Sequence, residues 1–79
     1  MVVPLNYLKQ GRKAIVVWIA LPGDCEPLLS LWGIEPDALI TCVYKHKGDG
    51  MSAYKIRHVV VALRADDSSK ILVKLLDPL

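Results

Sequence analysis

The sequence predicts a small, mostly β domain with one short helix inserted after its first strand. Three observations lead to this prediction. The chain has 79 residues, a length that suits a single domain. Its apolar segments are short and rich in β-branched and aromatic residues, which favour strands. Glycine, proline and aspartate separate these segments and are typical of turns. We therefore treat residues 1–79 as one domain.

The first expected elements are a strand and a short helix. Lys13–Leu21 has strand composition and ends at Pro22-Gly23, a turn signal. Asp24 can cap a helix from Glu26 to Trp32, which the following glycine would end. This helix is short and unusually apolar.

A second strand is expected over 38–44, and alternation divides its side chains between two faces. One face would carry Ile40, Cys42 and Tyr44. The other would carry Leu39, Thr41 and Val43. Because both sets are largely apolar, we expect this strand to be covered on both faces.

The remainder of the chain alternates between turns and strands. Residues 45–50 contain two glycines and no apolar side chain, as in a solvated hairpin loop. The later expected elements are two strands that meet near Arg57-His58, a helical turn and a last strand, in the order Ser52–Ile56, Val59–Leu63, Ala65–Ser69 and Ile71–Leu75. Five short strands fit a small closed or nearly closed barrel better than a sandwich, which needs about seven.

Composition limits the function classes. Hydrophobic residues make up 53% and the formal charge is only +2, so nucleic-acid binding is not favoured. The start of the chain does not resemble an export signal, and the longest apolar run is far shorter than the roughly 20 residues of a membrane span. We expect a soluble, cytoplasmic protein with no transmembrane segment of its own. Its two cysteines do not indicate a disulfide scaffold.

The sequence contains no pattern typical of an enzyme. Cys25 and Cys42 could act as nucleophiles only beside an oriented base, and nothing places one there. The glycine-containing loop at 48–50 lacks the lysine and the helix start of a phosphate cradle. We expect no catalysis and no nucleotide binding.

Metal binding has weak candidates. Their spacing is unlike that of a zinc ribbon or a metalloprotease helix, and ordinary surface roles explain them more simply. If ferrous iron or another transition metal bound directly, oxygen and imidazole ligands would be expected, and the candidates would be His46, Asp49 and His58. No resident cofactor is expected.

Two surface features could bind a partner. The apolar residues of the expected helix span more of its circumference than one core-facing stripe needs, and the candidate contacts are Leu28, Leu31 and Trp32. A basic patch around the hairpin of the second and third strands would steer the domain toward an acidic protein surface or anionic lipid headgroups, and its candidate contacts are Lys45, Lys47 and Arg57. The other members of this patch would be His46, Lys55 and His58. Ordinary exposed leucines and a solvated rim are the alternative interpretations.

Several phrases resemble the FeoA family, ferrous iron transport protein A, across nearly the whole chain. They are the leader from Pro4 to Gly11, the turn Trp32-Gly33-Ile34 with Pro36, and the closing phrase Ala62-Leu63-Arg64 with Asp67, Ile71 and Val73. Departures such as Asp37 in place of the usual glycine concern partner recognition more than the fold. The resemblance implies an SH3-like barrel that is cytosolic and assists the membrane ferrous iron transporter FeoB by protein contact.

The leading hypothesis is therefore a cytoplasmic protein-protein interaction module that acts on FeoB. Two alternatives come from other classes. A small nucleic-acid-binding barrel would show salt-sensitive binding and stacking by exposed aromatic side chains. A self-associating, metal-sensing module would change its mass with protein concentration or with metal.

Overall fold

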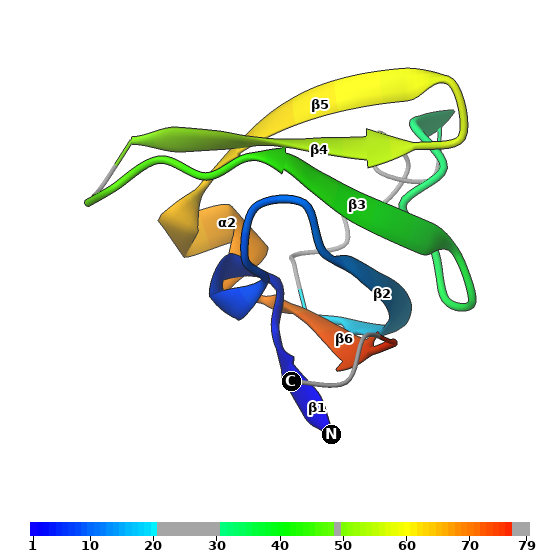
Figure 1. Ribbon diagram of the computed structural model, residues 1–79. Coiled ribbons are helices and arrows are strands. Elements are labelled where there is room, and N and C mark those ends of the chain that lie inside the picture. The colour runs from blue at the N-terminus through cyan, green and yellow to red at the C-terminus, as the bar shows by residue number, and fades with distance from the viewer. Residues whose placement is uncertain (21–30, 49, 77–79) are drawn as a thin grey trace.

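The computed structural model describes residues 1–20, 31–48 and 50–76. The described part is one antiparallel sheet with two short helices (Figure 1). Its strands are β1 (Val2–Pro4), β2 (Lys13–Ile19), β3 (Leu39–Tyr44), β4 (Met51–Ile56), β5 (Val59–Arg64) and β6 (Ile71–Leu75). The helices are the 3₁₀ helix η1 (Leu5–Tyr7) and the four-residue helix α2 (Ala65–Ser68).

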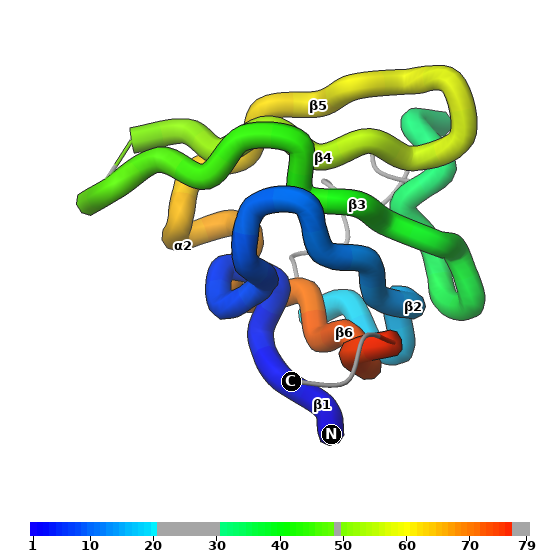
Figure 2. Tube along the Cα trace, in the orientation of Figure 1, coloured from blue at the N-terminus to red at the C-terminus, as the bar shows by residue number. Residues whose placement is uncertain are grey.

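The strands are hydrogen-bonded in the order β1-β6-β2-β3-β4-β5. The chain runs as a meander from β2 to β5, and β6 then returns to pair with both β1 and β2. Figures 1 and 2 show the sheet bent, with β4 and β5 on one side of the molecule and β1 and β6 on the other. β1 and β5 are the two edges, so the pairings of the described strands do not close the sheet. The mostly β class is confirmed, and a closed barrel stays a prediction.

One face of this bent sheet forms the core. Each long strand alternates buried and more exposed residues, as expected for a sheet covered on one side. The buried hydrophobic strand residues are Ala14, Val16, Ile40, Cys42, Tyr54, Ile56, Val61, Leu63, Ile71 and Val73. Leu5, the first residue of η1, Leu8, which follows η1, and Ile34 complete the hydrophobic cluster. Tyr54 is the largest fully buried side chain, and its hydroxyl bonds to Ser68 and Ser52.

The positions of five strands agree with the sequence prediction, but the count was wrong by one. β1 was missed because it has three residues, too few to show a period of two, and includes a proline. It forms an edge, where a proline is tolerated because the missing N–H faces outward. Val3 of β1 lies opposite Val73 of β6.

The prediction that β3 is covered on both faces was wrong. Ile40 and Cys42 are fully buried, whereas Leu39 and Val43 are 46% and 41% exposed. The register shifts between Cys42 and Tyr44, and Tyr44 is exposed rather than facing the core with its alternation partners. An irregularity of this kind re-aims the side chains that follow it.

The connections between the later strands agree with prediction. Residues 45–50 join β3 to β4, and Arg57 and His58 join β4 to β5. Arg57 has a φ of 57°, which such a tight turn requires and which is unusual for a residue other than glycine. α2 and β6 also lie where the sequence placed them.

Most of the predicted helix over Glu26 to Trp32, including Leu28, lies outside the described residues. Leu31 has helical conformation, and Trp32 and Gly33 form the turn that follows. The φ of Gly33 is 88°, as expected for the glycine predicted to end the helix. Trp32 packs against the core and is only partly buried.

Candidate docking site

Metal-ligating side chains and thiols are the first candidates for chemistry in residues 1–20, 31–48 and 50–76. No group of three or more His, Cys, Asp or Glu residues in these ranges could hold a metal ion. Cys42 is a free, buried thiol, and its burial raises its pKa. A thiol that is neutral and out of contact with solvent is a poor nucleophile. Cys25, the other cysteine, lies outside the described residues.

The three weak metal candidates are not brought together. His46 precedes β4 and His58 follows it. A six-residue strand is about 17 Å long, so these two imidazoles cannot share an ion within one chain. Asp49 lies outside the described residues.

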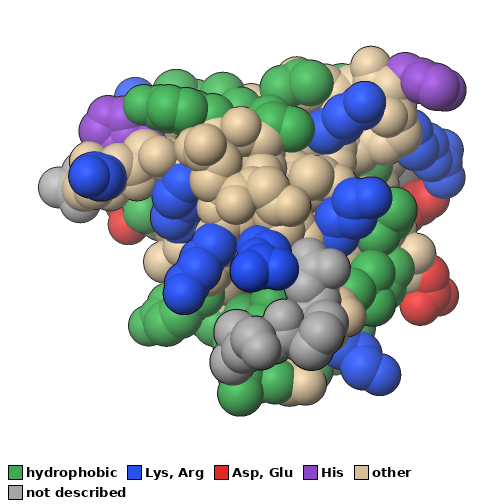
Figure 3. Space-filling view, viewed as in Figure 1, with side chains coloured by type: hydrophobic (Ala, Val, Ile, Leu, Met, Phe, Trp, Pro, Cys, Tyr) green, Lys and Arg blue, Asp and Glu red, His purple; other side chains and the backbone are tan. Residues whose placement is uncertain are grey.

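The predicted basic patch is divided in the same way. Lys45 and Lys47 lie in the loop between β3 and β4, whereas Arg57 lies at the far end of β4. The expectation that these residues gather around one hairpin was therefore wrong. Figure 3 shows the basic residues spread across one face and the two histidines at opposite ends of it.

The loop that follows β3 is held against the N-terminal segment. The Lys45 ammonium donates to the carbonyl of Asn6, and the Lys45 backbone N–H donates to Gln10 Oε1 at 3.0 Å. The backbone N–H of His46 donates to Ser52 Oγ, also at 3.0 Å. Lys45 thus has a structural role as well as a charge, while Lys47 is exposed.

The opposite end of β4 lies near the turn that follows Leu31, one of the predicted apolar contacts. Arg57 Nη2 lies 3.5 Å from Glu35 Oε1, an ion pair on the surface. The stem of Arg57 also runs beside Gly33, where a Cβ would come 3.9 Å from its Cδ. Arg57 is therefore next to the turn that follows Leu31, whose side chain is 80% exposed. Of the predicted apolar contacts that the structure describes, Leu31 is free to meet a partner, and Trp32 is partly used by the core.

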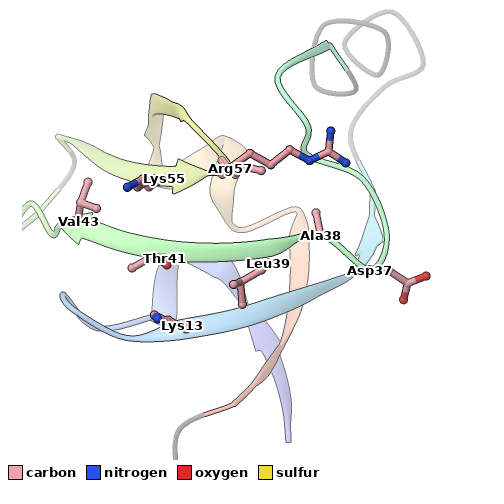
Figure 4. Close-up of a pocket in the computed structure, with 9 residues that line it drawn as sticks. Lys13, Asp37, Ala38, Leu39, Thr41, Val43, Lys55 and Arg57 are labelled. Carbon is pink, nitrogen blue, oxygen red and sulfur yellow. The ribbon is translucent and has the colours of Figure 1, made fainter.

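The outward face of β3 forms the floor of a groove of about 630 Å³ (Figure 4). The floor consists of Leu39, Thr41 and Val43. Lys13 on β2 forms one wall, and Lys55 and Arg57 form the other. We call this feature the β3 groove.

The β3 groove could not be predicted from the sequence. Alternation did place Leu39, Thr41 and Val43 on one face, but it could not show that this face is uncovered. The register of β2 and β4 against β3 brings Lys13 and Lys55 to either side of Thr41. No local pattern in the sequence encodes that register. The one signal available was charge, because none of the segments that form the described strands contains Asp or Glu.

None of the helices in the described ranges reaches the length and apolarity that crossing a membrane would need.

Known proteins share this fold. A crystal structure of an iron uptake regulatory protein (FeoA) matches with a TM-score of 0.87 and 29% identity, over 96% of this chain and 100% of that one. The FeoA protein from Chlorobium tepidum matches with a TM-score of 0.84 and 21% identity, over 95% of this chain and 71% of that one. A manganese-dependent transcriptional repressor has the same TM-score of 0.84 at 20% identity, over 95% of this chain but only 42% of its own. The last two matches, at such low identity, show the fold alone.

No match was found among curated proteins. The model of the FeoA domain matches residues 3–75, nearly the whole sequence. The chain therefore belongs to the FeoA domain family, whose small accessory domains are involved in ferrous iron transport and are not a known enzyme family.

Proposed function

We propose that this chain is a cytoplasmic accessory protein that docks on the ferrous iron transporter FeoB by protein contact. Membership of the FeoA family supports a role in ferrous iron transport. The partner itself is inferred from that membership. The described side chains include no group of three or more metal-ligating residues, which is consistent with a role in protein contact.

The observation that carries this proposal is the exposure of Leu31. A leucine of helical conformation that is 80% exposed, followed by a partly buried tryptophan, offers an apolar contact. Arg57, with its partner Glu35, lies beside Gly33 in the turn that follows this leucine. Apolar anchors with a charged rim are typical of protein interfaces.

Copurification tests this contact. Leu31→Lys should abolish copurification with FeoB from detergent-solubilised membranes, because burying an unpaired ammonium in an apolar contact is costly. Its melting temperature should stay near that of the unchanged chain, since the side chain is exposed. Leu28→Lys tests the neighbouring position predicted from the sequence.

Leu76→Lys is the matched control, because Leu76 is also an exposed leucine and lies elsewhere on the molecule, directly after β6. Retained copurification of Leu31→Lys with FeoB would remove this surface from the proposal. Loss with both variants would point to a general effect of added charge.

Self-association is a second candidate, favoured by one observation. β5 is an edge of the sheet, and its residue Val60 is 58% exposed. An exposed apolar edge strand is a common site of strand pairing between chains. Sedimentation over a range of protein concentrations tests it, and a constant monomeric mass would exclude it.

The proposal requires no metal ion on this chain. Anaerobic titration with ferrous iron, followed by NMR, should leave the resonances of His46 and His58 unbroadened. Stoichiometric broadening of either imidazole would instead support the metal-sensing alternative.

A further inference from the structure

The β3 groove carries an inference beyond the proposed contact with FeoB, because Leu31 is not among the residues that line it. We propose that the groove binds an extended, acidic segment of a partner protein, with one carboxylate held between Lys13 and Lys55 above Thr41.

Strand register places the three polar groups in one row. Lys13 lies opposite Thr41, and Thr41 lies opposite Lys55. Figure 4 shows these residues side by side on β2, β3 and β4. Neighbouring strands are about 4.8 Å apart, so the two lysine Cα atoms are about 10 Å apart. Lysine stems are long enough for both ammonium groups to reach one carboxylate between them, and the threonine hydroxyl can donate to it.

The floor suits an extended chain. Leu39 and Val43 flank Thr41 at intervals of two residues and are 46% and 41% exposed. An extended segment that lies along β3 presents every second side chain to this floor, with the same spacing. Apolar side chains on either side of a central acidic one would therefore meet Leu39 and Val43.

Charge favours an acidic occupant. Lys13, Lys55 and Arg57 line the groove, and Asp37 at one end is the only carboxylate among its lining residues. The Asp37 side chain points away from the strands in Figure 4. Lys13 and Lys55 are the main recognition groups in this interpretation, because strand register places them on either side of Thr41.

The shape favours a peptide over other anions. A trough along one strand with raised cationic walls matches a single extended chain, whereas a lipid surface requires a flat or convex face. A nucleic acid needs a longer track of cations than three side chains provide, and the formal charge of the chain is only +2.

Fluorescence anisotropy with the full chain tests the inference. The probe is a short fluorescein-labelled peptide in which glutamate and valine alternate. We expect saturable binding that weakens with added salt, because the contacts are exposed ion pairs. A peptide with glutamine in place of each glutamate should bind at least about tenfold more weakly, as expected for lost charge pairs. In ¹⁵N NMR, the amide shifts should be confined to the segments that line the groove, which are 13, 37–43 and 55–57.

Matched variants locate the site. Thr41→Glu should abolish binding, because a carboxylate would occupy the proposed position of the ligand. Lys55→Glu should weaken binding by about tenfold or more, and Lys55→Gln by less. Lys70→Glu makes the same charge change in the exposed turn between α2 and β6 and should leave binding unchanged. All of these side chains except Thr41 are exposed, and circular dichroism will show that each variant is folded.

Three results would overturn the inference. The first is equal affinity for the glutamate and glutamine peptides. The second is binding to phosphatidylserine vesicles or to a single-stranded oligonucleotide with no binding to the glutamate peptide. The third is peptide-induced shifts outside the groove. None of these outcomes depends on FeoB, so failure here leaves the proposed contact through Leu31 standing, and the reverse also holds.

Discussion

The two faces of β3 differ in environment more than in composition. On the inner face, Ile40 and Cys42 are fully buried in the core. On the outer face, Leu39 and Val43 are about half exposed and form the floor of a groove with cationic walls. Both pairs are apolar, so hydrophobicity alone does not decide which face is covered. Coverage is decided by where the bend of the sheet brings other strands against it.

This comparison separates stability from binding. The inner face holds the fold together, because apolar area removed from water is the main favourable contribution to folding. Substitutions on the outer face should change the stability of the fold little, so its side chains can serve recognition. Pairs of variants that carry the same kind of substitution on the inner and the outer face test this division.

The largest contrast is expected between Ile40→Ala and Leu39→Ala. Ile40 is fully buried, so its truncation should lower the free energy of unfolding by about 2–5 kcal/mol. Leu39→Ala on the outer face should cost less than about 1 kcal/mol. Urea denaturation measures both, and similar losses would show that the outer face is also covered.

Gly33→Ala should lower the free energy of unfolding by about 2 kcal/mol, for two reasons. Its φ of 88° disfavours any residue with a Cβ, and that Cβ would lie 3.2 Å from Ile56 Cγ2 on the inner face. Gly11→Ala is the matched control, because Gly11 has a φ of 84° but no atom within 4 Å of the added Cβ. It should cost about 1 kcal/mol, from backbone conformation alone. Equal losses of unfolding free energy would show that packing at Gly33 is not tight.

Alkaline pH should destabilise the fold through the inner face. Burial raises the pKa of both the Cys42 thiol and the Tyr54 hydroxyl, so the folded chain holds these protons to a higher pH than the unfolded chain does. The contribution of these groups to the free energy of unfolding is therefore fully present below about pH 8. It is lost as the pH rises above the ordinary pKa values of about 8.5 and 10, because the unfolded chain loses these protons first. Each group can contribute at most about 1.4 kcal/mol per pH unit.

Urea midpoints measured from pH 7 to pH 11 test this dependence. Cys42→Ala and Tyr54→Phe should each flatten the decline with pH, although both also remove packing or hydrogen bonds. Tyr44→Phe, at an exposed position, should leave the decline unchanged. An unaltered slope in the Tyr54 variant would contradict the assignment.

The smallest effect is expected at the outer ion pair. Arg57 and Glu35 are 3.5 Å apart, with side chains 71% and 45% exposed. Exposed pairs contribute about 0–1 kcal/mol, so Glu35→Gln should change the free energy of unfolding by less than about 1 kcal/mol. Thermal denaturation at low and high salt measures it. A larger loss would indicate that Glu35 supports the inner face.

Much of the fold could be predicted because its signals are local. Lys13–Ile19 and Val59–Arg64 are rich in β-branched residues, and Arg57-His58 lies where the junction of two strands was expected. β1 could not be predicted, since three residues that include a proline adopt strand conformation only because β6 pairs with them. The exposure of Tyr44 depended on an irregularity that alternation does not reveal.

The candidate site was less predictable than the fold. The exposure of Leu31 agreed with the excess of apolar residues in the predicted helix. The basic residues were expected in one group, but the length of β4 separates Lys45 and Lys47 from Arg57. Thr41 was never a candidate, because only the two lysines on either side of it give it a role in the proposed site.

The sequence by itself determined where strands β2 to β6 lie and that reactive residues are few. Those properties follow from each residue and its near neighbours, which are fixed by covalent order. Only the tertiary structure decided that one face of β3 is buried while the other is open, and that Lys13, Thr41 and Lys55 share a row. Such neighbours meet across hydrogen-bonded strands, and a shift of one residue in register would turn every side chain of a strand to the opposite face.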